Sequence, residues 1–267
     1  MLKIATWNVN SIRKRIDQLC SFVTEDEIDI IMLQEIKCTN EQFPYEQIEQ
    51  LGYKCIVHGE KARNGVAILS KYPVIEDSLS TSIVDNEEAR YLECLIECNG
   101  FNLRVASVYV PNGQSIDSEA FKYKLHFFDC LYQRLHDLFG KEEITIVGGD
   151  YNVAPNKIDV HDDYANEDKI GFNIDERGKL FAILHSGYCD AFRITNPESK
   201  EFSWWDYREG SWQQNKGMRI DHILLSPEAT DRLEKCYINN KMRAKENPSD
   251  HAPVVCVLEE SINYSLK

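Results

Sequence analysis

Short apolar runs alternate along the chain with longer segments in which apolar residues recur at helical spacing. A short run bounded by polar or turn residues predicts a buried strand, and the longer period predicts an amphipathic helix. On this pattern we expect strands at residues 3–8, 28–33, 53–57, 66–70, 91–97, 101–108, 144–147, 220–225 and 254–259. Helices are expected from residue 12 onward and at residues 45–51, 118–139 and 175–186.

Local signals refine several of these elements. Asn10 or Ser11 is a candidate N-cap for the first helix, because such side chains accept a hydrogen bond from the first turn. Asn99-Gly100 favours a tight turn between two antiparallel strands. The longest helix carries its apolar stripe on Phe121, Leu125, Phe128, Leu131, Leu135 and Leu138. Mixed strand pairing with helices outside indicates an α/β protein with two packed sheets covered by helices.

The segment Ile144-Thr-Ile-Val-Gly-Gly-Asp150-Tyr-Asn152-Val-Ala-Pro155 joins an apolar strand to polar residues. The two glycines are expected to open a turn, and Asp150 and Asn152 follow it, although Asp and Asn are depleted in strands. In α/β sheets ligands bind at the carboxyl ends of strands, where these side chains would project. The alternative is a local Asx turn, in which the side chains bond neighbouring backbone.

Composition is that of a globular protein. The chain has 267 residues, of which 43% are hydrophobic and 28% charged, so we expect a single catalytic domain over residues 1–267. The formal net charge of −14 argues against a polybasic DNA-binding protein. Net charge says little about the local field, however, and carboxylates gathered at a cation site add to the acidic count.

The cysteines and the first residues of the chain indicate the cellular compartment in which the protein works. The nine cysteines lack paired spacing and are expected to be free thiols, and Cys94 and Cys98 have a poor zinc spacing, so no structural metal is expected. The polar first residues differ from a signal peptide, and no apolar run approaches the roughly 20 residues of a membrane helix. We therefore expect a cytoplasmic protein without a membrane partner.

Polar side chains stand at the ends of several other predicted strands. They are Asn8, Glu35, Tyr109, Asn112, Asp221, Asp250 and His251. One such group is an ordinary turn, but a set dominated by Asp, Glu, Asn and His predicts one convergent site.

These residue types suit phosphoester hydrolysis assisted by a hard cation. Mg²⁺ binds carboxylates, water and substrate phosphate, and Glu35 and Asp250 could supply the carboxylates. His251 could bond a phosphate oxygen while Asp221 orients its ring, and Asp150 would position or deprotonate the attacking water. The chain lacks the Gly-x-x-x-x-Gly-Lys-Ser/Thr loop of P-loop nucleotide triphosphatases and the Gly-x-Ser-x-Gly of α/β-hydrolases.

Six motifs in order carry a resemblance to a known family. They are Trp7-Asn8-Val9-Asn10, Leu33-Gln34-Glu35-Ile36-Lys37, Tyr109-Val110-Pro111-Asn112, Gly149-Asp150-Tyr151-Asn152-Val153-Ala154-Pro155, Arg219-Ile220-Asp221 and Ser249-Asp250-His251-Ala252-Pro253. In this order they resemble the exonuclease III family of abasic (AP) endonucleases in the endonuclease/exonuclease/phosphatase superfamily. The resemblance extends from residue 1 to about 259. It implies a DNase I-like, four-layer α/β sandwich of two packed mixed β-sheets flanked by helices.

The resemblance also implies an activity. It is Mg²⁺-dependent cleavage of the DNA phosphodiester 5′ to abasic sites in base excision repair, with Mn²⁺ as an alternative cation. Such enzymes often add 3′-to-5′ exonuclease and 3′-phosphodiesterase or phosphatase activity. The implied partner is double-stranded DNA with abasic sites or blocked 3′ ends, and the implied state is a monomer.

By their positions in the motifs, Glu35, Asn8 and Asp250 resemble the residues around the family's metal ion, with Glu35 as the main ligand. The implied catalytic residues are Asp150, which activates water or protonates the leaving group, Asn152, which orients water and phosphate, Tyr109 near the scissile phosphate, and the phosphate-binding pair of Asp221 and His251. Asn10 stands where some relatives carry an Asp, which argues against a second metal.

Substrate choice is expected to depend on residues 202–220. Trp204, Met218 and Ile220 match positions that line the family's pocket for a flipped-out abasic sugar, and Asn112 matches a phosphate contact. A sugar without its base is small enough for such apolar walls, and extruding it costs less than extruding a stacked nucleotide. For Trp204 and Trp205 the alternative is core or surface filling.

Two charged segments have more than one interpretation, and two other functions remain as alternatives. Arg13 and Lys37 are expected to bind DNA. Residues 13–15, with Lys61 and Arg63, are candidates for a phosphate-binding rim, and the alternative is that these charge clusters are solvated faces. Residues 159–163, Asp-Val-His-Asp-Asp, are expected to form a solvated loop in preference to a second metal site. The rivals are a phosphatase or phosphodiesterase of the superfamily that acts on a non-DNA phosphoester, and a catalytically inactive DNA-binding module.

Overall fold

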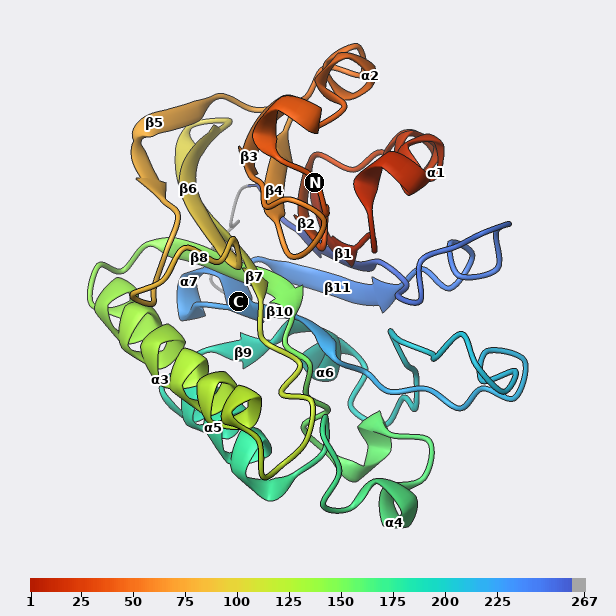
Figure 1. The fold of residues 1–267 in the computed structure, drawn as a ribbon. Helices are drawn as coiled ribbons and strands as arrows, with labels where there is room; N and C mark the ends of the chain where they lie inside the picture. Colours follow the sequence, from red (N-terminus) through yellow and green to blue (C-terminus); the bar gives the residue numbers. More distant parts are fainter. Residues whose placement is uncertain (261–267) are drawn as a thin grey trace.

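Two six-stranded mixed sheets pack face to face, and helices cover the outer face of each (Figure 1). The computed structural model describes residues 1–260. The domain expected for residues 1–267 therefore includes a last segment, 261–267, that lies outside the described residues. The α/β fold with two packed mixed sheets flanked by helices is confirmed.

The first sheet has the strand order β11-β12-β1-β2-β4-β3. Its central strands β1 (Leu2–Asn8) and β2 (Ile30–Gln34) run parallel, and its other neighbouring pairs are antiparallel. The other strands are β3 (Lys54–His58), β4 (Val66–Ser70), β11 (Leu233–Ile238) and β12 (Val254–Leu258). Helices α1 (Ile12–Glu25) and α2 (Tyr45–Glu49) share an apolar cluster with its outer face.

The second sheet has the order β5-β6-β7-β8-β10-β9. Its parallel pair is β7 (Phe101–Tyr109) and β8 (Ile144–Asp150). Helices α3 (Glu119–Phe139) and α5 (Ile174–His185) lie side by side on its outer face (Figure 1). The remaining elements are β5 (Val74–Ser80), β6 (Tyr91–Cys98), β9 (Cys189–Asp190), β10 (Asp221–Leu225), α4 (Asp163–Asn166), α6 (Ala191–Thr195), α7 (Pro227–Thr230) and the 3₁₀ turns η1 (Asn40–Gln42) and η2 (Lys157–Asp159).

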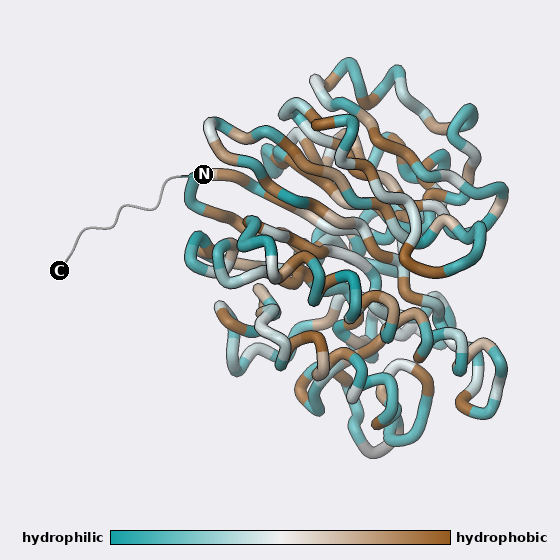
Figure 2. Tube along the Cα trace, turned by 90° about the vertical axis from the view of Figure 1, so that its left-hand side faces the viewer, coloured by the Kyte–Doolittle hydropathy of each residue, from teal (hydrophilic) through white to brown (hydrophobic). Residues whose placement is uncertain are grey.

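The main apolar core lies between the sheets, and hydrophobic strands are visible inside the molecule in Figure 2. Gly148 explains how closely the sheets approach. A Cβ at this position would lie 2.4 Å from Cε of Met32 on the facing sheet, so a larger residue would push the sheets apart. Gly148 and Gly149 both belong to β8. The expectation that they open a turn is therefore wrong, because sheet packing selects glycine at Gly148.

Two local predictions are also wrong. Ser11 occupies the N-cap position of α1, but its φ is 87° and its side chain accepts no capping hydrogen bond. Instead its backbone N–H donates to the carbonyl of Glu35 at 2.8 Å, so the loop after β2 holds the helix start. On α3 the expected stripe residue Leu125 is only half-buried, whereas Lys124 is fully buried.

Other predictions are confirmed. Asn99 and Gly100 have positive φ values of 36° and 95°, as a tight hairpin between β6 and β7 requires. All nine cysteines are free thiols. Within the described residues 1–260, no helix has the length and apolar character needed to cross a membrane.

Candidate active site

The polar strand ends meet at one edge of the sandwich. Asn8 ends β1, Glu35 directly follows β2, and Asp150 ends β8. Asp221, the first residue of antiparallel β10, pairs with Asp150 in the sheet register. Because β1 and β2 are parallel, as are β7 and β8, their carboxyl ends bring these groups together.

A cavity of about 240 Å³ opens at this edge. It is lined by Glu35, Tyr109, Asn112, Asp150, Asn152, Ile170, Gly171, Trp204, Met218, Ile220, Asp250 and His251. Asn8 and Asp221 lie behind this lining and are fully buried. Ile170 and Gly171 were not predicted, because they lie in a loop before α5 that lacks polar residues at a strand end.

Asp150 uses its two carboxylate oxygens differently. Oδ1 accepts a hydrogen bond from the backbone N–H of Asn152 at 2.9 Å, which is the Asx turn considered as the alternative. Oδ2 accepts from Asn8 Nδ2 at 2.9 Å and lies 3.7 Å from Nε2 of His251. The local turn thus fixes the carboxylate while its second oxygen faces the candidate site.

His251 lies between two carboxylates. Its Nδ1 is 2.8 Å from Oδ2 of Asp221, which also accepts from the Ser203 hydroxyl at 2.6 Å. Burial alone would lower the pKa of His251, but the charges of Asp221 and Asp150 raise it to about 10. The ring therefore carries a positive charge at neutral pH and can donate from Nε2 toward an anion in the cavity.

Asp150 is the carboxyl group whose pKa lies nearest neutrality. Its burial raises the pKa to about 7, while the charge of His251 opposes this rise and that of Asp221 adds to it. A carboxyl group with such a pKa can accept or donate a proton near neutral pH, as general acid–base catalysis requires.

Glu35 stays ionised although it is largely buried. Burial would raise its pKa, but the charge of Lys37 and hydrogen bonds from Asn8 and Lys37 leave the pKa below its ordinary value. Asn8 Nδ2 donates to Oε1 at 2.8 Å, and Lys37 Nζ lies 2.6 Å from Oε2. Glu35 and Lys37 have φ values of 50° and 52°, uncommon for such residues and typical of backbone held in a functional site.

Asp250 approaches the same region from the loop before β12. Its Oδ2 accepts from Trp204 Nε1 at 3.1 Å, and its Oδ1 accepts from Asn10 Nδ2 at 2.9 Å. Burial would raise its pKa, but His251 and these two donors lower it overall, so the carboxylate keeps its charge.

A divalent cation fits this arrangement. Ligand atoms of Glu35, Asp150 and His251 all lie within 4.8 Å of one another. His251 is protonated and held by Asp221, so carboxylate oxygens are better ligands than the imidazole. Glu35 belongs to this group and Asp250 lines the same cavity, and such hard oxygen donors suit Mg²⁺. Asn8 turns Nδ2 toward the carboxylates, while its Oδ1 accepts from the backbone of Asn10 at 3.0 Å. In this structure Asn8 links two carboxylates.

Two asparagine amides form the floor of the cavity. Asn112 Nδ2 donates to Asn152 Oδ1 at 3.1 Å, and Asn152 Nδ2 donates to the Val110 carbonyl at 3.0 Å. Each amide nitrogen carries a second proton for a ligand. Tyr109 lies beside them with the Arg90 guanidinium 4.7 Å from its ring centre, and burial with the nearby carboxylates raises its pKa well above the ordinary value. Tyr109 is therefore a protonated donor.

Apolar side chains form the opposite wall. Trp204, Met218 and Ile220 line the cavity and pack with the buried Phe172 and Val160. The backbone of Trp204 forms bridges with Met218 and His251, which fixes the apolar wall to the polar groups. The core-filling alternative holds for the second tryptophan, because Trp205 is buried in the core between the sheets.

The basic residues predicted near the site differ in their surroundings. Arg13 and Lys14 are exposed near the start of α1. Arg15 donates to the backbone carbonyls of Asn10 and Pro248, so it supports loops beside the site. Lys37 bonds Glu35 and the Oδ1 of Asn10 at 2.6 Å each. In this structure Lys37 balances charge within the site and lies outside the cavity lining.

The solvated-loop prediction for residues 159–163 is wrong at its first residue. Asp159 is fully buried and accepts from Nε of the equally buried Arg219 at 2.7 Å. It also forms an ion pair with Arg193 at 2.5 Å. Arg219 lies between the cavity wall residues Met218 and Ile220, so this ion-pair network supports that wall.

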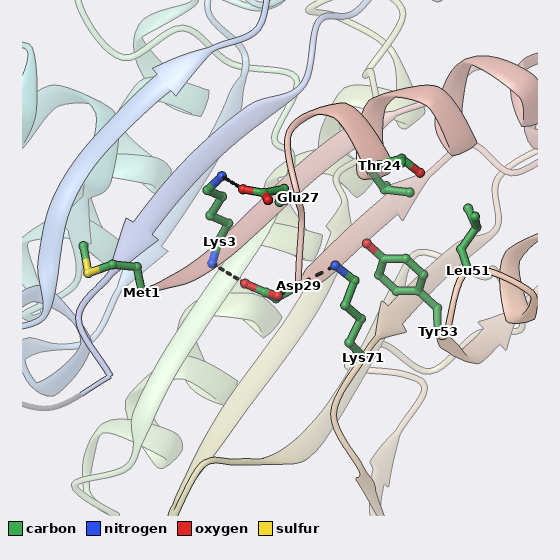
Figure 3. Close-up of a pocket in the computed structure, with 9 residues that line it drawn as sticks. Met1, Lys3, Thr24, Glu27, Asp29, Leu51, Tyr53 and Lys71 are labelled. Carbon is green, nitrogen blue, oxygen red and sulfur yellow. Dashed lines mark hydrogen bonds and ion pairs between the residues drawn. The ribbon is translucent and has the colours of Figure 1, made fainter.

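A larger cavity, about 500 Å³, lies at the other end of β1, beside Lys3 (Figure 3). Its cationic groups already have partners. Lys3 Nζ donates to the Asp26 carbonyl. It also donates to Glu27, and Lys71 Nζ lies 3.9 Å from Asp29 (Figure 3). The smaller cavity at Asn8 is the better candidate because buried charged groups and amides converge there.

The chain is similar to known proteins over nearly its whole length. The profile of the Endonuclease/Exonuclease/phosphatase family matches residues 5–251. Exodeoxyribonuclease III of Haemophilus influenzae is 36% identical over 265 residues, which cover 95% of this chain and 98% of the relative. An AP endonuclease from Archaeoglobus fulgidus has a similar structure, with a TM-score of 0.90 and 37% identity over 97% of this chain and 100% of that one. A 3′ phosphatase from Neisseria, solved with a product DNA hairpin, has a TM-score of 0.92 and 33% identity over the same shares.

Proposed function

The chain belongs to the endonuclease/exonuclease/phosphatase family and is a hydrolytic nuclease or phosphodiesterase of the exodeoxyribonuclease III type, and we propose that it hydrolyses the DNA phosphodiester bond 5′ to abasic sites with Mg²⁺. The observation that carries this proposal is the small cavity with an apolar wall beside the buried charged groups. Its volume of about 240 Å³ is below the roughly 300–1,000 Å³ of pockets for drug-sized ligands. A sugar that lacks its base suits this space better than a whole nucleotide does.

The position of each polar group in the cavity indicates its role in the proposed reaction. Glu35 and Asp250 would hold the cation, which when bound would neutralise phosphate charge and polarise the phosphoryl group, and Mn²⁺ would suit the same oxygens. Asp150 accepts a proton from the attacking water. The His251 imidazolium, oriented by Asp221, donates to a phosphate oxygen.

The remaining groups position the substrate. The free amide protons of Asn112 and Asn152 bond phosphate oxygen or the attacking water. The Tyr109 phenol, protonated at neutral pH, lines the same cavity and would donate to the leaving oxygen. Trp204, Met218 and Ile220 receive the extruded sugar. All these residues come from one chain, so we propose that a monomer is active.

A second activity uses the same phosphate site at the end of a DNA strand. The similarity to the 3′ phosphatase from Neisseria favours removal of blocking groups from 3′ ends. Hydrolysis of a 3′-terminal phosphoester needs the same attacking water and the same neutralisation of phosphate charge. It differs in that no DNA strand continues beyond the phosphate. We propose that the protein also has 3′-phosphatase, 3′-phosphodiesterase and 3′-to-5′ exonuclease activity on double-stranded DNA, as secondary activities.

A panel of phosphoesters distinguishes the proposal from its rivals. The protein is incubated in Mg²⁺ with duplex DNA containing a tetrahydrofuran abasic analogue, with a duplex ending in a 3′-phosphate, and with an inositol polyphosphate. Turnover of the two DNA substrates alone is expected. Faster phosphate release from the inositol compound would favour the non-DNA phosphoesterase, and no turnover of any substrate would favour an inactive DNA-binding module.

A further inference from the structure

Lys124 is a buried cation that the proposed mechanism does not use. It lies on α3 among apolar stripe residues and is fully buried. Its Nζ donates to the backbone carbonyls of Asn152 at 2.7 Å and Asn112 at 3.2 Å and forms an ion pair with the fully buried Glu176. These contacts use all three ammonium protons.

The contacts of this pair converge on loops that form the cavity. Asn112 and Asn152 are the two floor residues whose side chains bond each other. On the other side, Glu176 of α5 accepts from the backbone N–H of Asn173 at 2.9 Å, in the capping box that begins α5. Residues 170–171, which line the cavity, are separated from this cap by Phe172 alone. The pair thus joins the loops after β7, after β8 and before α5.

The local backbone is adapted to Lys124. Asn152 has a φ of 51°, and its carbonyl accepts from the ammonium. Gly113, next to Asn112, has a φ of 94°, and a Cβ there would lie 3.1 Å from Cδ of Lys124. Glycine therefore allows the loop after β7 to pass close to the lysine stem.

Stability alone is a weak reason for this pair. Removing an ammonium and a carboxylate from water costs several kcal/mol per ion, and an apolar pair of the same volume often stabilises a fold equally well. An apolar pair could not donate hydrogen bonds to two carbonyls, however. What the ammonium adds is the placement of Asn112 and Asn152 relative to each other.

We propose that Lys124, held by Glu176, is a positioning residue that sets the two asparagine amides for the phosphate and the attacking water. The inference rests on the proposed function, because that function gives the two amides their role. Lys124 touches no substrate in this account. It acts through the backbone of Asn112 and Asn152.

The test compares variants that remove both charges of the pair, so that no ion is left buried alone. Lys124→Met/Glu176→Gln keeps the side-chain lengths and an acceptor for the α5 cap. We expect kcat for abasic-site incision to fall about 100-fold, the effect of misplacing reacting groups by about 1 Å. The Kd for the same duplex in EDTA should change much less.

A remote buried cation provides the matched control. Arg104 pairs with Glu93 and Glu143 and lies roughly 16 Å before Tyr109 along β7 at the usual strand rise. In Arg104→Met, Glu93 keeps its partner Arg134, and kcat should equal that of the wild type. Lys124→Leu/Glu176→Gln repeats the test with another apolar side chain that cannot donate to the carbonyls, if the methionine version does not fold.

A second readout does not depend on the reaction. In protein labelled with ¹⁵N-asparagine, the side-chain NH₂ signals of Asn112 and Asn152 should shift in both double variants and stay in place in Arg104→Met. Wild-type kcat or unshifted amide signals in a folded double variant would overturn the positioning role. A wild-type protein that cuts no DNA, with shifted amide signals in the variants, would instead contradict the proposed function alone.

Discussion

Nε2 of His251 lies 3.7 Å from Oδ2 of Asp150, so the proposed phosphate donor and the proposed proton acceptor share one buried site. The pKa of Asp150 is raised to about 7, chiefly by burial. The pKa of His251 is raised to about 10 by Asp221 and Asp150, against the effect of burial. Between these values Asp150 is ionised while His251 keeps its proton, which is the combination the proposed reaction needs.

The rate should therefore depend on pH with two limbs. We expect kcat/KM to rise as pH increases toward about 7, because Asp150 must lose its proton, and to fall as pH approaches about 10, because His251 loses its charge. A bound cation lowers the pKa of Asp150, so the first limb should lie below 7 in Mg²⁺. Incision rates measured from acid to alkaline pH test this prediction. A rate that does not change with pH would contradict the roles of Asp150 and His251 in proton transfer and phosphate binding.

Asp150→Asn should separate catalysis from stability. Turnover should fall by several orders of magnitude because the amide cannot accept the proton, while the duplex still binds. The wild-type pKa is raised from 3.8, so Asp150 contributes stability that is fully present below 3.8 and lost as pH rises through about 7. The amide of the variant carries no charge to bury at pH 8. In EDTA at that pH, the free energy of unfolding of Asp150→Asn should therefore exceed that of the wild type by a few kcal/mol. Near-normal turnover or lower stability at pH 8 would contradict the assignment; urea unfolding measures the latter.

Trp204→Phe should weaken the response to metal. Phenylalanine keeps an aromatic wall but loses the hydrogen bond from Nε1 to Asp250. Loss of such a partner of a ligand typically costs roughly 10–100-fold in metal affinity. The Mg²⁺ concentration that gives half-maximal rate should rise accordingly. An unchanged Mg²⁺ titration would show that Trp204 does not hold Asp250 for the cation.

Ile220→Ala should relax the choice of substrate. Ile220 narrows the cavity on the apolar wall, and removing its methyl groups leaves room for a larger group than a sugar. A few methylene groups in an apolar pocket change discrimination by roughly 10–200-fold. The ratio of abasic-site incision to removal of ordinary 3′ nucleotides should therefore fall by about 10-fold or more. An unchanged ratio would exclude this wall from substrate choice.

Asp159→Asn should destabilise the fold strongly. Breaking one side of a buried ion pair typically costs about 3–5 kcal/mol. This change gives Arg193 a neutral partner and leaves Arg219 with Asp190 as its ionised partner, so the lower end of that range is expected. Asp163→Asn is the matched control from the same segment, because its carboxylate lies nearer the surface in an ion pair with Lys157, and such a pair contributes about 0–1 kcal/mol. Equal stabilities of the two variants in urea would contradict the buried network.

Much of the fold could be predicted because many strands are apolar on both faces. The strands β1, β2, β4 and β12 lie in the interior or pack against it, and their sequences are nearly continuous apolar runs. β5 and β11 were missed because each lies at a sheet edge with several exposed polar residues. Their strand conformation depends on the neighbouring strand more than on their own composition.

The site could be predicted only in part. Polar residues at strand ends are visible in the sequence, and they led to the lining residues Glu35, Asp150 and His251. The buried ion pairs of Lys124 and Asp159 were missed because their partners, Glu176 and Arg219, are distant in sequence. Such side chains resemble solvated charges until tertiary structure supplies the partner.

Incision of a duplex with one tetrahydrofuran analogue at a known position tests the central claim most directly. The account predicts a single cut immediately 5′ to the analogue in Mg²⁺, no cut after EDTA removes the metal, and no internal cut in the matched undamaged duplex. Absence of that cut in Mg²⁺, or equal internal cutting of both duplexes, would contradict it.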